Sequence, residues 1–430
     1  MVVPEIKKEF NIQEYLKRFT YTETNDLSLF IKPSVARVEY IDIEGKTYPQ
    51  FINEYWTSKQ RQASSIHEIS YRACFKAQLP KFFIQLLTTK GETVYDPFNG
   101  RGTTVIEAAL LGRNIIANDI NPLSIILSQP RLFVPDLKDV QKRLEKIEFD
   151  YTLKADIDLT MFYHFKTEAE IISIKNYLVN KKQTGKEDEI DRWIRMVATN
   201  RLTGHSINFF SVYTFPPNQA ISAKKQIKIN QARNQIPEYK DTKRIILKKT
   251  SDLVSKLTEE EKNILKLIGK KSVFLNKDAR LTPEIPDGTI KLTVTSPPFL
   301  DIVQYADDNW LRCWFNGINV DEISQKITMT KNIKDWCDIM SSVFKELYRI
   351  TQKGGWVAFE VGEVRKGKIK LDEFVIPLGI KAGFICEGVL LNEQQFTKTA
   401  NIWGINNNNK GTNTNRIILF KKRIKKSINE

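Results

Sequence analysis

The sequence predicts an α/β protein in which a doubly wound sheet is interrupted by a long, mainly helical insertion. Residues 93–118 read as a short apolar strand, a glycine-rich turn, a helix and a second strand, which is how such a sheet begins. The strand pattern stops from about residue 130 to residue 270, where the chain is charged and helical in places. It returns with apolar strands at 272–275 and 290–295. We therefore expect one α/β domain with a large insertion between its second and third strands.

The first elements follow from apolar periodicity and from the positions of glycine. Residues 1–60 mix polar, aromatic and charged positions without a clear period, so we expect an N-terminal extension there. Residues 77–87 carry apolar side chains at helical spacing, and Gly91 ends that pattern. The helix after the glycine-rich turn is expected to begin at Thr104 and to end before Gly112.

The elements beyond the insertion complete the predicted domain. We expect a helix at 339–348, a turn at Lys353-Gly354-Gly355, a strand at 356–359 and a last strand at 416–420. The chain then divides into an N-terminal extension at 1–60, a first core segment at 61–130, an insertion at 131–270 and a second core segment at 271–430.

Charge and composition narrow the class of protein. Lys and Arg outnumber Asp and Glu by 66 to 51, and the net charge of +15 favours a polyanionic partner such as nucleic acid. Hydrophobic residues at 41% suffice for a buried core, and charged residues at 27% argue against a disordered or membrane-embedded chain. We see no targeting segment or membrane span and expect a cytoplasmic protein. Four scattered cysteines and three histidines predict no metal site.

The turn after the first strand is a candidate cofactor site. Residues 96–104 read Asp-Pro-Phe-Asn-Gly-Arg-Gly-Thr-Thr. The glycines let the backbone approach a ligand closely, and the helix N-terminus offers free N–H groups. Asp119, at the end of the second strand, can accept hydrogen bonds from both hydroxyls of a ribose. The alternatives are an ordinary strand-to-helix turn and, for Asp119, a helix cap.

This turn resembles, without gaps, the S-adenosylmethionine motif Asp-Pro-Phe-x-Gly-x-Gly-Thr-Thr of the amino-directed DNA methyltransferases. The resemblance implies a Rossmann-like methyltransferase domain with a mixed, twisted sheet and S-adenosylmethionine as cofactor. It places the ribose at Asp119, the adenine beside Asp278, and a segment that closes over the cofactor at Phe75. The implied cofactor-binding residues are Phe75, Lys76, Asp96, Phe98, Asn99, Gly100, Gly102, Thr103, Thr104, Asp119, Ile120, Asp278 and Ala279.

The catalytic candidates are Ser296, Pro297, Pro298 and Phe299, at the end of the predicted fourth strand. Two prolines fix the backbone and remove two N–H donors, so the Ser296 hydroxyl and the Pro297 carbonyl can accept hydrogen bonds from an exocyclic amine. Phe299 offers an aromatic face to a base rotated out of the duplex. Alone, the motif could equally be an ordinary Pro-Pro strand end.

The tetrapeptide also resembles the family's Asp/Asn/Ser-Pro-Pro-aromatic motif. Its Ser form is similar to that of the cytosine-N4 enzymes, whereas Asp or Asn is usual in adenine-N6 enzymes. A carbon-5 cytosine enzyme needs a Cys nucleophile, normally after proline, and no cysteine here follows one. Adenine N6, an RNA guanine-N2 methyltransferase and an inactive DNA-binding protein stay open as alternatives.

The insertion is expected to recognise double-stranded DNA. Its basic middle has few acidic residues, and the interleaved amides can read base edges. A solvated basic helix is the alternative. The candidate DNA-binding residues are Lys224, Lys225, Lys228, Asn230, Gln231, Arg233, Asn234, Lys243 and Arg244. The resemblance implies a restriction–modification system with a cognate restriction endonuclease as a candidate partner, while the oligomeric state stays open.

Overall fold

The chain folds into two compact units, each built from segments that are distant in sequence. One comprises residues 1–61, 283–299 and 333–430, and the other 62–282 and 300–332. The computed structural model describes residues 10–20, 36–56, 63–71, 74–214, 221–298, 305–326, 330, 332–364, 368–393 and 414–424. Among these residues, no helix has both the length and the apolar character needed to cross a membrane.

The unit formed by 62–282 and 300–332 contains the predicted strand–turn–helix–strand. Strand β4 (Asn114–Asn118) lies between β3 (Thr93–Asp96) and β5 (Val273–Leu275), and both pairings are parallel. Helix α3 (Thr103–Leu110) connects β3 to β4, and α2 (Gln78–Leu87) precedes β3. The predictions of these strands and helices are confirmed.

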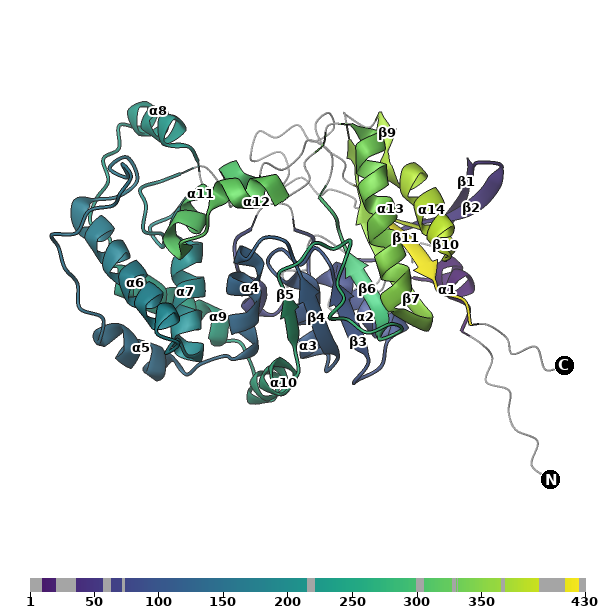
Figure 1. Cartoon of the computed structure of the whole chain (residues 1–430), viewed down its shortest axis with the longest axis horizontal. Helices are drawn as coiled ribbons and strands as arrows, with labels where there is room; N and C mark the ends of the chain where they lie inside the picture. The colour runs from purple at the N-terminus through teal and green to yellow at the C-terminus, as the bar shows by residue number, and fades with distance from the viewer. Residues whose placement is uncertain are drawn as a thin grey trace, which may run out of the picture. The chain divides into compact units, whose positions relative to one another are not determined.

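Helices fill the sequence between β4 and β5 (Figure 1). Trp193 is fully buried, and its indole N–H donates to Thr250 Oγ1 at 3.1 Å, which joins two of these helices. Outside the insertion, a short 3-10 helix, η1 (Ser65–His67), precedes α2 in sequence. The helices of the insertion are α4 (Leu123–Ser128), η2 (Gln129–Leu132), α5 (Leu137–Glu145), α6 (Phe165–Gln183), α7 (Glu189–Arg201), α8 (Ala223–Arg233), α9 (Thr242–Val254) and α10 (Glu259–Gly269).

Two further helices of this unit follow the tetrapeptide in sequence. They are α11 (Tyr305–Asn316) and α12 (Val320–Lys326). Asn316 Nδ2 donates to Thr199 Oγ1 at 2.9 Å, which fastens α11 to α7 of the insertion. The Trp310 indole donates to the carbonyl of Ile221 at 3.4 Å. Helix α11 therefore packs against the insertion.

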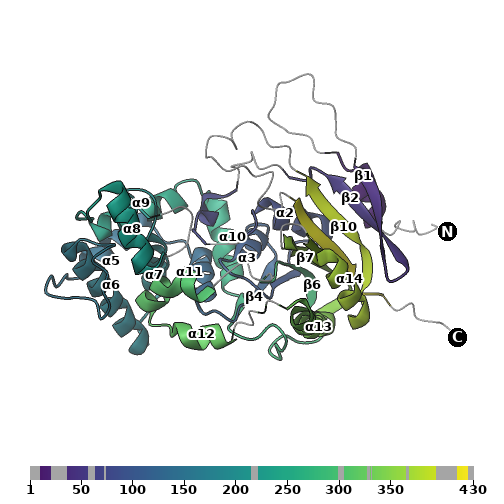
Figure 2. The same ribbon diagram turned by 90° about the horizontal axis from the view of Figure 1, so that it is seen from above.

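The other unit contains a mixed sheet with strand order β1-β2-β10-β11-β7-β6 (Figure 2). Neighbours pair antiparallel in β1–β2, β10–β11 and β11–β7, and parallel in β2–β10 and β6–β7. Phe344 packs between Phe359 and Phe420, with ring centroids 4.8 and 5.3 Å away. The strands are β1 (Arg37–Ile43), β2 (Lys46–Asn53), β6 (Ile290–Thr295), β7 (Thr351–Val361), β10 (Ile385–Glu393) and β11 (Thr414–Lys421).

The remaining elements of this unit lie against or beside the sheet. Helix α14 (Leu371–Ala382) contacts β10, β11 and α13 (Ile333–Ile350), and α1 (Ile12–Arg18) contacts β10. A short antiparallel pair joins β8 (Glu363–Val364) to β9 (Ile369–Lys370).

One predicted element of this unit is wrong. Residues Lys353-Gly354-Gly355 lie inside β7 and not in a turn before a strand. Gly354 has a φ of +73°, and the pairing with β6 shifts register between Ile290 and Leu292. A Cβ on Gly355 would lie 3.0 Å from the Ile290 carbonyl oxygen, so a glycine is needed there. The two glycines form an irregularity within a continuous strand.

Candidate cofactor and catalytic site

The glycine-rich turn leaves β3 and starts α3 through left-handed backbone. Gly100 and Gly102 have φ angles of +51° and +83°, a region that favours glycine. The N–H of Asn99 donates to the Asn118 carbonyl at 3.0 Å, and that of Gly102 donates to the Asn99 carbonyl at 2.7 Å. The turn is thus tied to β4 and closed on itself, and Thr103 begins α3 directly after it.

Asp119 lies at the carboxyl end of β4 and contacts the same turn. Its Oδ2 accepts a hydrogen bond from the N–H of Gly100 at 2.7 Å, and its Oδ1 accepts one from the N–H of Asn121 at 2.9 Å. Burial raises the pKa of Asp119 to about 6, although both hydrogen bonds lower it. Two bonds leave acceptor positions on a carboxylate, so Asp119 can still receive hydroxyl donors. Asp119 is not the residue that bonds the first N–H of α4. That N–H, of Leu123, donates to Asn121 Oδ1 at 3.0 Å.

The other predicted cofactor residues lie around the carboxyl ends of β3, β4 and β5. Asp96 is buried and accepts from the N–H of Phe98 at 3.1 Å, while Thr103 and Thr104 are buried at the start of α3. Asn276 Nδ2 donates to the carbonyls of Asp119 and Ile120 at 2.7 and 2.9 Å. This joins the end of β5 to the end of β4. Next along the chain, Asp278 is paired with Arg280 and Ala279 is buried.

The segment before α2 was predicted to close over the cofactor, and among the described residues Phe75 and Lys76 form no hydrogen bond with the glycine-rich turn. Phe75 is half-buried and Lys76 exposed, and the Lys76 carbonyl accepts the Leu79 N–H at the start of α2. Tyr71, which the sequence reasoning missed, lies against the turn, because a Cβ on Gly100 would be 3.5 Å from its ring.

These residues fit S-adenosylmethionine in their chemistry. Asp119 supplies a carboxylate acceptor suited to ribose hydroxyls, and α3 presents its N-terminus at the turn. The side-chain oxygen of Asn99 is buried and has no hydrogen-bond partner among the described residues. An unpaired buried acceptor is costly and is typical of a site that a ligand completes.

The catalytic tetrapeptide follows β6, in the unit that contains 283–299. Thr295, the last residue of β6, is paired with Phe359 of β7. Ser296 is half-buried and Pro297 is buried, and the Pro298 carbonyl accepts a 3.0 Å hydrogen bond from the Trp336 indole N–H. Trp336, on α13, is only 3% exposed and was not predicted. Phe299 lies outside the described residues.

Comparison with known proteins finds similarity to DNA methylases. An N6/N4 family model described as DNA methylase matches residues 7–127. The chain is 26% identical over 325 residues to the type II methyltransferase M.BsoBI of Geobacillus stearothermophilus. It is 25% identical over 292 residues to the type II methyltransferase M.MvaI of Kocuria varians. Residues 7–127 are therefore similar to the N6/N4 DNA methylase family, and the longer matches are to type II methyltransferases.

The two matches cover 68% and 61% of this chain. They cover 61% and 60% of the curated relatives, so the chain spans about three fifths of their length. The predicted resemblance to the N6/N4 DNA methylases, a family that uses S-adenosylmethionine, is confirmed, and the comparisons do not separate cytosine N4 from adenine N6.

Solved structures include more distant matches. A protein described as a DNA modification methylase of Thermus thermophilus, complexed with S-adenosyl-L-methionine, aligns with 34% of this chain and 54% of its own. That match has 18% identity and a TM-score of 0.22. The rRNA methyltransferase AviRa of Streptomyces viridochromogenes aligns with 86% of this chain and 96% of its own, at 9% identity and a TM-score of 0.34.

The predicted DNA-binding cations of the insertion differ in how free they are. Lys224, Lys225 and Lys228 on α8 are exposed, as is Arg244 on α9. Lys243 instead donates to the Ile147 carbonyl at 2.7 Å and lies over a phenylalanine ring. Arg233 stacks on the ring of Tyr213 at 3.9 Å. The α8 lysines and Arg244 are therefore the cations most available to a phosphate.

The predicted amide readers also differ. Asn230 donates to the Met161 carbonyl at 2.8 Å and accepts from Gln226 and Gln235 at 2.7 and 2.8 Å. Asn234 is exposed and ends α8 in the left-handed conformation, with φ at +49°. Gln231 is exposed. The Asn230 amide is thus engaged within the protein, whereas Gln231 and Asn234 face solvent.

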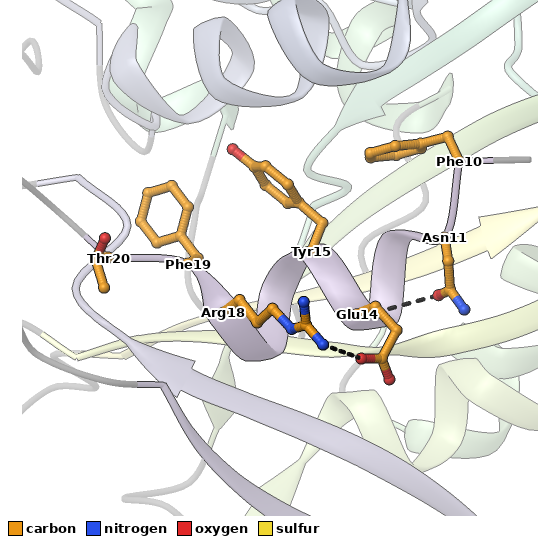
Figure 3. Close-up of a pocket in the computed structure, with 7 residues that line it drawn as sticks. All are labelled: Phe10, Asn11, Glu14, Tyr15, Arg18, Phe19 and Thr20. Carbon is orange, nitrogen blue, oxygen red and sulfur yellow. Dashed lines mark hydrogen bonds and ion pairs between the residues drawn. The ribbon is translucent and has the colours of Figure 1, made fainter. Parts of the chain in front are cut away.

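A separate pocket of about 880 Å³ lies on α1, away from every predicted site residue in sequence (Figure 3). Asn11 caps this helix by accepting from the Gln13 N–H at 3.0 Å. Tyr15 stands between Phe10 and Phe19, with ring centroids 5.9 and 6.0 Å away. The pocket is lined by Phe10, Asn11, Glu14, Tyr15, Arg18, Phe19 and Thr20.

Proposed function

We propose that this protein transfers a methyl group from S-adenosylmethionine to the exocyclic N4 amine of cytosine in double-stranded DNA. The observation that carries the proposal is the Ser-Pro-Pro-Phe tetrapeptide directly after β6, in a chain whose residues 7–127 match the N6/N4 DNA methylase family model. The net charge of +15 supports a polyanionic substrate. The relatives M.BsoBI and M.MvaI, both type II methyltransferases, support a role as the modification enzyme of a restriction–modification system.

The amine is the harder reactant to activate. Its lone pair is conjugated with the ring, so it is a poor nucleophile. In our proposal, the Ser296 hydroxyl and the Pro297 carbonyl accept hydrogen bonds from its two protons, which favours a tetrahedral nitrogen with a free lone pair. The Trp336 hydrogen bond to the next carbonyl holds the tetrapeptide in place. Phe299 supports the base after it leaves the stack.

The cofactor residues orient the other reactant. When bound, S-adenosylmethionine would supply an electrophilic methyl group on a positively charged sulfur. The S–C bond would break as the N–C bond forms, S-adenosylhomocysteine would leave, and one amine proton would pass to solvent. Asp119 is proposed to hold the ribose hydroxyls, while the turn from Asp96 to Thr104 passes along the methionine part. Much of the acceleration then comes from alignment of the amine with the methyl group, because the protein contributes no covalent step.

Adenine N6 is the nearest alternative, since its amine has the same chemistry. The Ser at the first position of the tetrapeptide favours cytosine, because Asp or Asn is usual there in the adenine enzymes. We further propose that the insertion supplies target recognition, with the α8 lysines on the phosphate backbone and exposed amides on base edges.

Labelled S-adenosylmethionine tests the reaction class. The purified protein should transfer label to duplex DNA that contains many different sequences, and not to ribosomal RNA. The Ser296→Ala variant should transfer little label while it still binds the cofactor. Label found only in RNA would contradict DNA methylation and show that the protein is an RNA methyltransferase. No transfer to any nucleic acid by the parent would support an inactive DNA-binding protein.

A further inference from the structure

One face of the helical segment α4–η2 contacts the cofactor turn at several points. Ser124, Ser128 and Arg131 follow one another at spacings of four and three residues, which places them on one face. Asn99 Nδ2 donates to the hydroxyls of Ser124 and Ser128 at 2.7 and 3.1 Å. Arg131 Nη2 donates to the carbonyl of Arg101. The middle of the turn, residues 99–101, is therefore held by this face.

Arg131 is an unusual residue to find at this position. Its side chain is 0% exposed, and among the described residues it forms no ion pair with a carboxylate. Its other hydrogen bonds go to the carbonyls of Leu127 at 2.9 Å and Ile66 at 3.2 Å. Burial of an unpaired charge is expensive, and it lowers the pKa of Arg131 to about 9. A residue whose role was only to fill the core would avoid that cost.

The contact at Gly102 shows how closely this face fits the turn. A Cβ on Gly102 would lie 2.5 Å from Ser128 Cβ and 3.1 Å from Arg131 Nη2. Gly102 also has a φ of +83°, so neither its conformation nor its surroundings admit another residue. The clamp, defined as Ser124, Ser128 and Arg131, thus sets the backbone at the start of α3.

We propose that Arg131 is a positioning residue for the cofactor. It holds the Arg101 carbonyl and so fixes the backbone of residues 99–102 in the conformation that S-adenosylmethionine meets. This inference rests on the proposed function for one point, the identity of the cofactor as S-adenosylmethionine. The guanidinium reaches three carbonyls from one rigid plane, whereas a lysine at this position keeps the charge but lacks the fork.

Arg113 provides a matched control. It is also buried, and its guanidinium donates to the Leu111 and Thr88 carbonyls at 2.5 and 2.8 Å and to Thr88 Oγ1 at 3.0 Å. It lies just before β4, at the opposite end of that strand from Asp119. Arg113→Lys should therefore lower the melting temperature as Arg131→Lys does, with no change at the turn.

Hydrogen exchange of the cofactor-free protein tests the clamp directly. Arg131→Lys should speed exchange of the backbone amides of residues 99–104, and calorimetry should show an S-adenosylmethionine Kd raised about tenfold, as for a lost charged hydrogen bond. Arg113→Lys should change neither quantity. If Arg131→Lys does not fold, Ser128→Ala should show the same two effects at smaller size.

Three results would overturn the positioning role. Parent-like exchange and Kd in a folded Arg131→Lys variant would do so, as would equal losses in Arg113→Lys. Parent-like values in Ser128→Ala, where Arg131→Lys cannot be obtained, would also contradict it. A parent protein that fails to bind S-adenosylmethionine would instead contradict the proposed function, and the exchange experiment would still decide on the clamp.

Discussion

The carboxylate of Asp119 accepts a hydrogen bond from the backbone N–H of Gly100 at 2.7 Å. The end of β4 is thereby tied to the glycine-rich turn that follows β3. The contact is buried, and this raises the pKa of the carboxyl group to about 6 from an ordinary value of 3.8. Cofactor binding should consequently respond to pH near neutrality.

The first prediction concerns that pH dependence. Ribose hydroxyls donate to the ionised carboxylate, so S-adenosylmethionine affinity should rise as pH increases through about 6, by at most about tenfold per unit below it. For the cofactor-free fold the sign is opposite, because a raised carboxyl pKa contributes stability below 3.8 that is lost as pH rises through 6. Calorimetry from pH 5 to 8 measures the affinity. A flat parent profile, or an unchanged slope in Asp119→Asn, would contradict the assignment.

The second prediction concerns the size of the Asp119 contribution. Asp119→Ala should weaken S-adenosylmethionine binding by about 1–3 kcal/mol, as expected for lost charge-assisted hydrogen bonds. Asp139→Ala removes an exposed carboxylate from α5 and should leave the affinity unchanged. Calorimetry on folded variants compares them. Equal affinities for the Asp119 variant and the parent would move the ribose contact elsewhere.

The third prediction separates catalysis from cofactor binding. Ser296→Ala and Phe299→Ala should lose most methyl transfer and keep much of the cofactor affinity, because both act on the base. Single-turnover rates and calorimetry give the two quantities. Near-normal turnover in both variants would show that the assigned catalytic roles are wrong.

The fourth prediction tests the support of the tetrapeptide. Trp336→Phe keeps an aromatic ring but removes the N–H that donates to the Pro298 carbonyl. We expect a lower kcat with an unchanged Kd for S-adenosylmethionine. Trp356→Phe, at another buried tryptophan on β7, should change neither beyond its effect on stability. A parent-like kcat for Trp336→Phe would remove this residue from the account of catalysis.

The fifth prediction concerns DNA binding by α8. Replacement of Lys224, Lys225 and Lys228 by Gln should flatten the slope of log K against log salt by roughly two to three units, at about 0.9 per lost phosphate contact. The same charge change at Lys266, Lys270 and Lys271, also exposed, should leave the slope intact. Gln231→Ala should relax base preference with little effect on the slope. A parent-like slope in the α8 variant would show that these lysines face solvent and do not contact DNA phosphates.

The sequence predicted the strands, glycine-rich turn and helix of residues 93–118, because their signals are local. Glycines at 100 and 102, a strand on each side and Asp119 after the second strand all lie within 27 residues of one another in the printed sequence. The structure places the Asp119 carboxylate against Gly100. In the same way, α2, α3 and the neighbouring strands follow from apolar spacing that needs no knowledge of distant residues.

The contacts that the sequence did not reveal are those between distant segments. Trp336 reaches Pro298 across 38 residues, and β2 pairs with β10, more than 300 residues later. Strands β1 and β2 lie within residues 1–60, where the sequence shows no clear apolar period. Without knowledge of the distant partner β10, this segment was predicted only as an N-terminal extension. Gly354 was predicted to lie in a turn before a strand, but the structure keeps its positive φ inside β7. Asn230 looked like a base reader until its three partners were known.

The identity of the methylated base tests the central claim most directly. Plasmid DNA methylated by the purified protein would be digested to nucleosides and analysed by mass spectrometry, with unmethylated plasmid and the Ser296→Ala variant as controls. We expect N4-methyldeoxycytidine, which is absent from both controls. N6-methyldeoxyadenosine as the product would contradict the cytosine assignment and show that Ser at the first position of the tetrapeptide does not select the base.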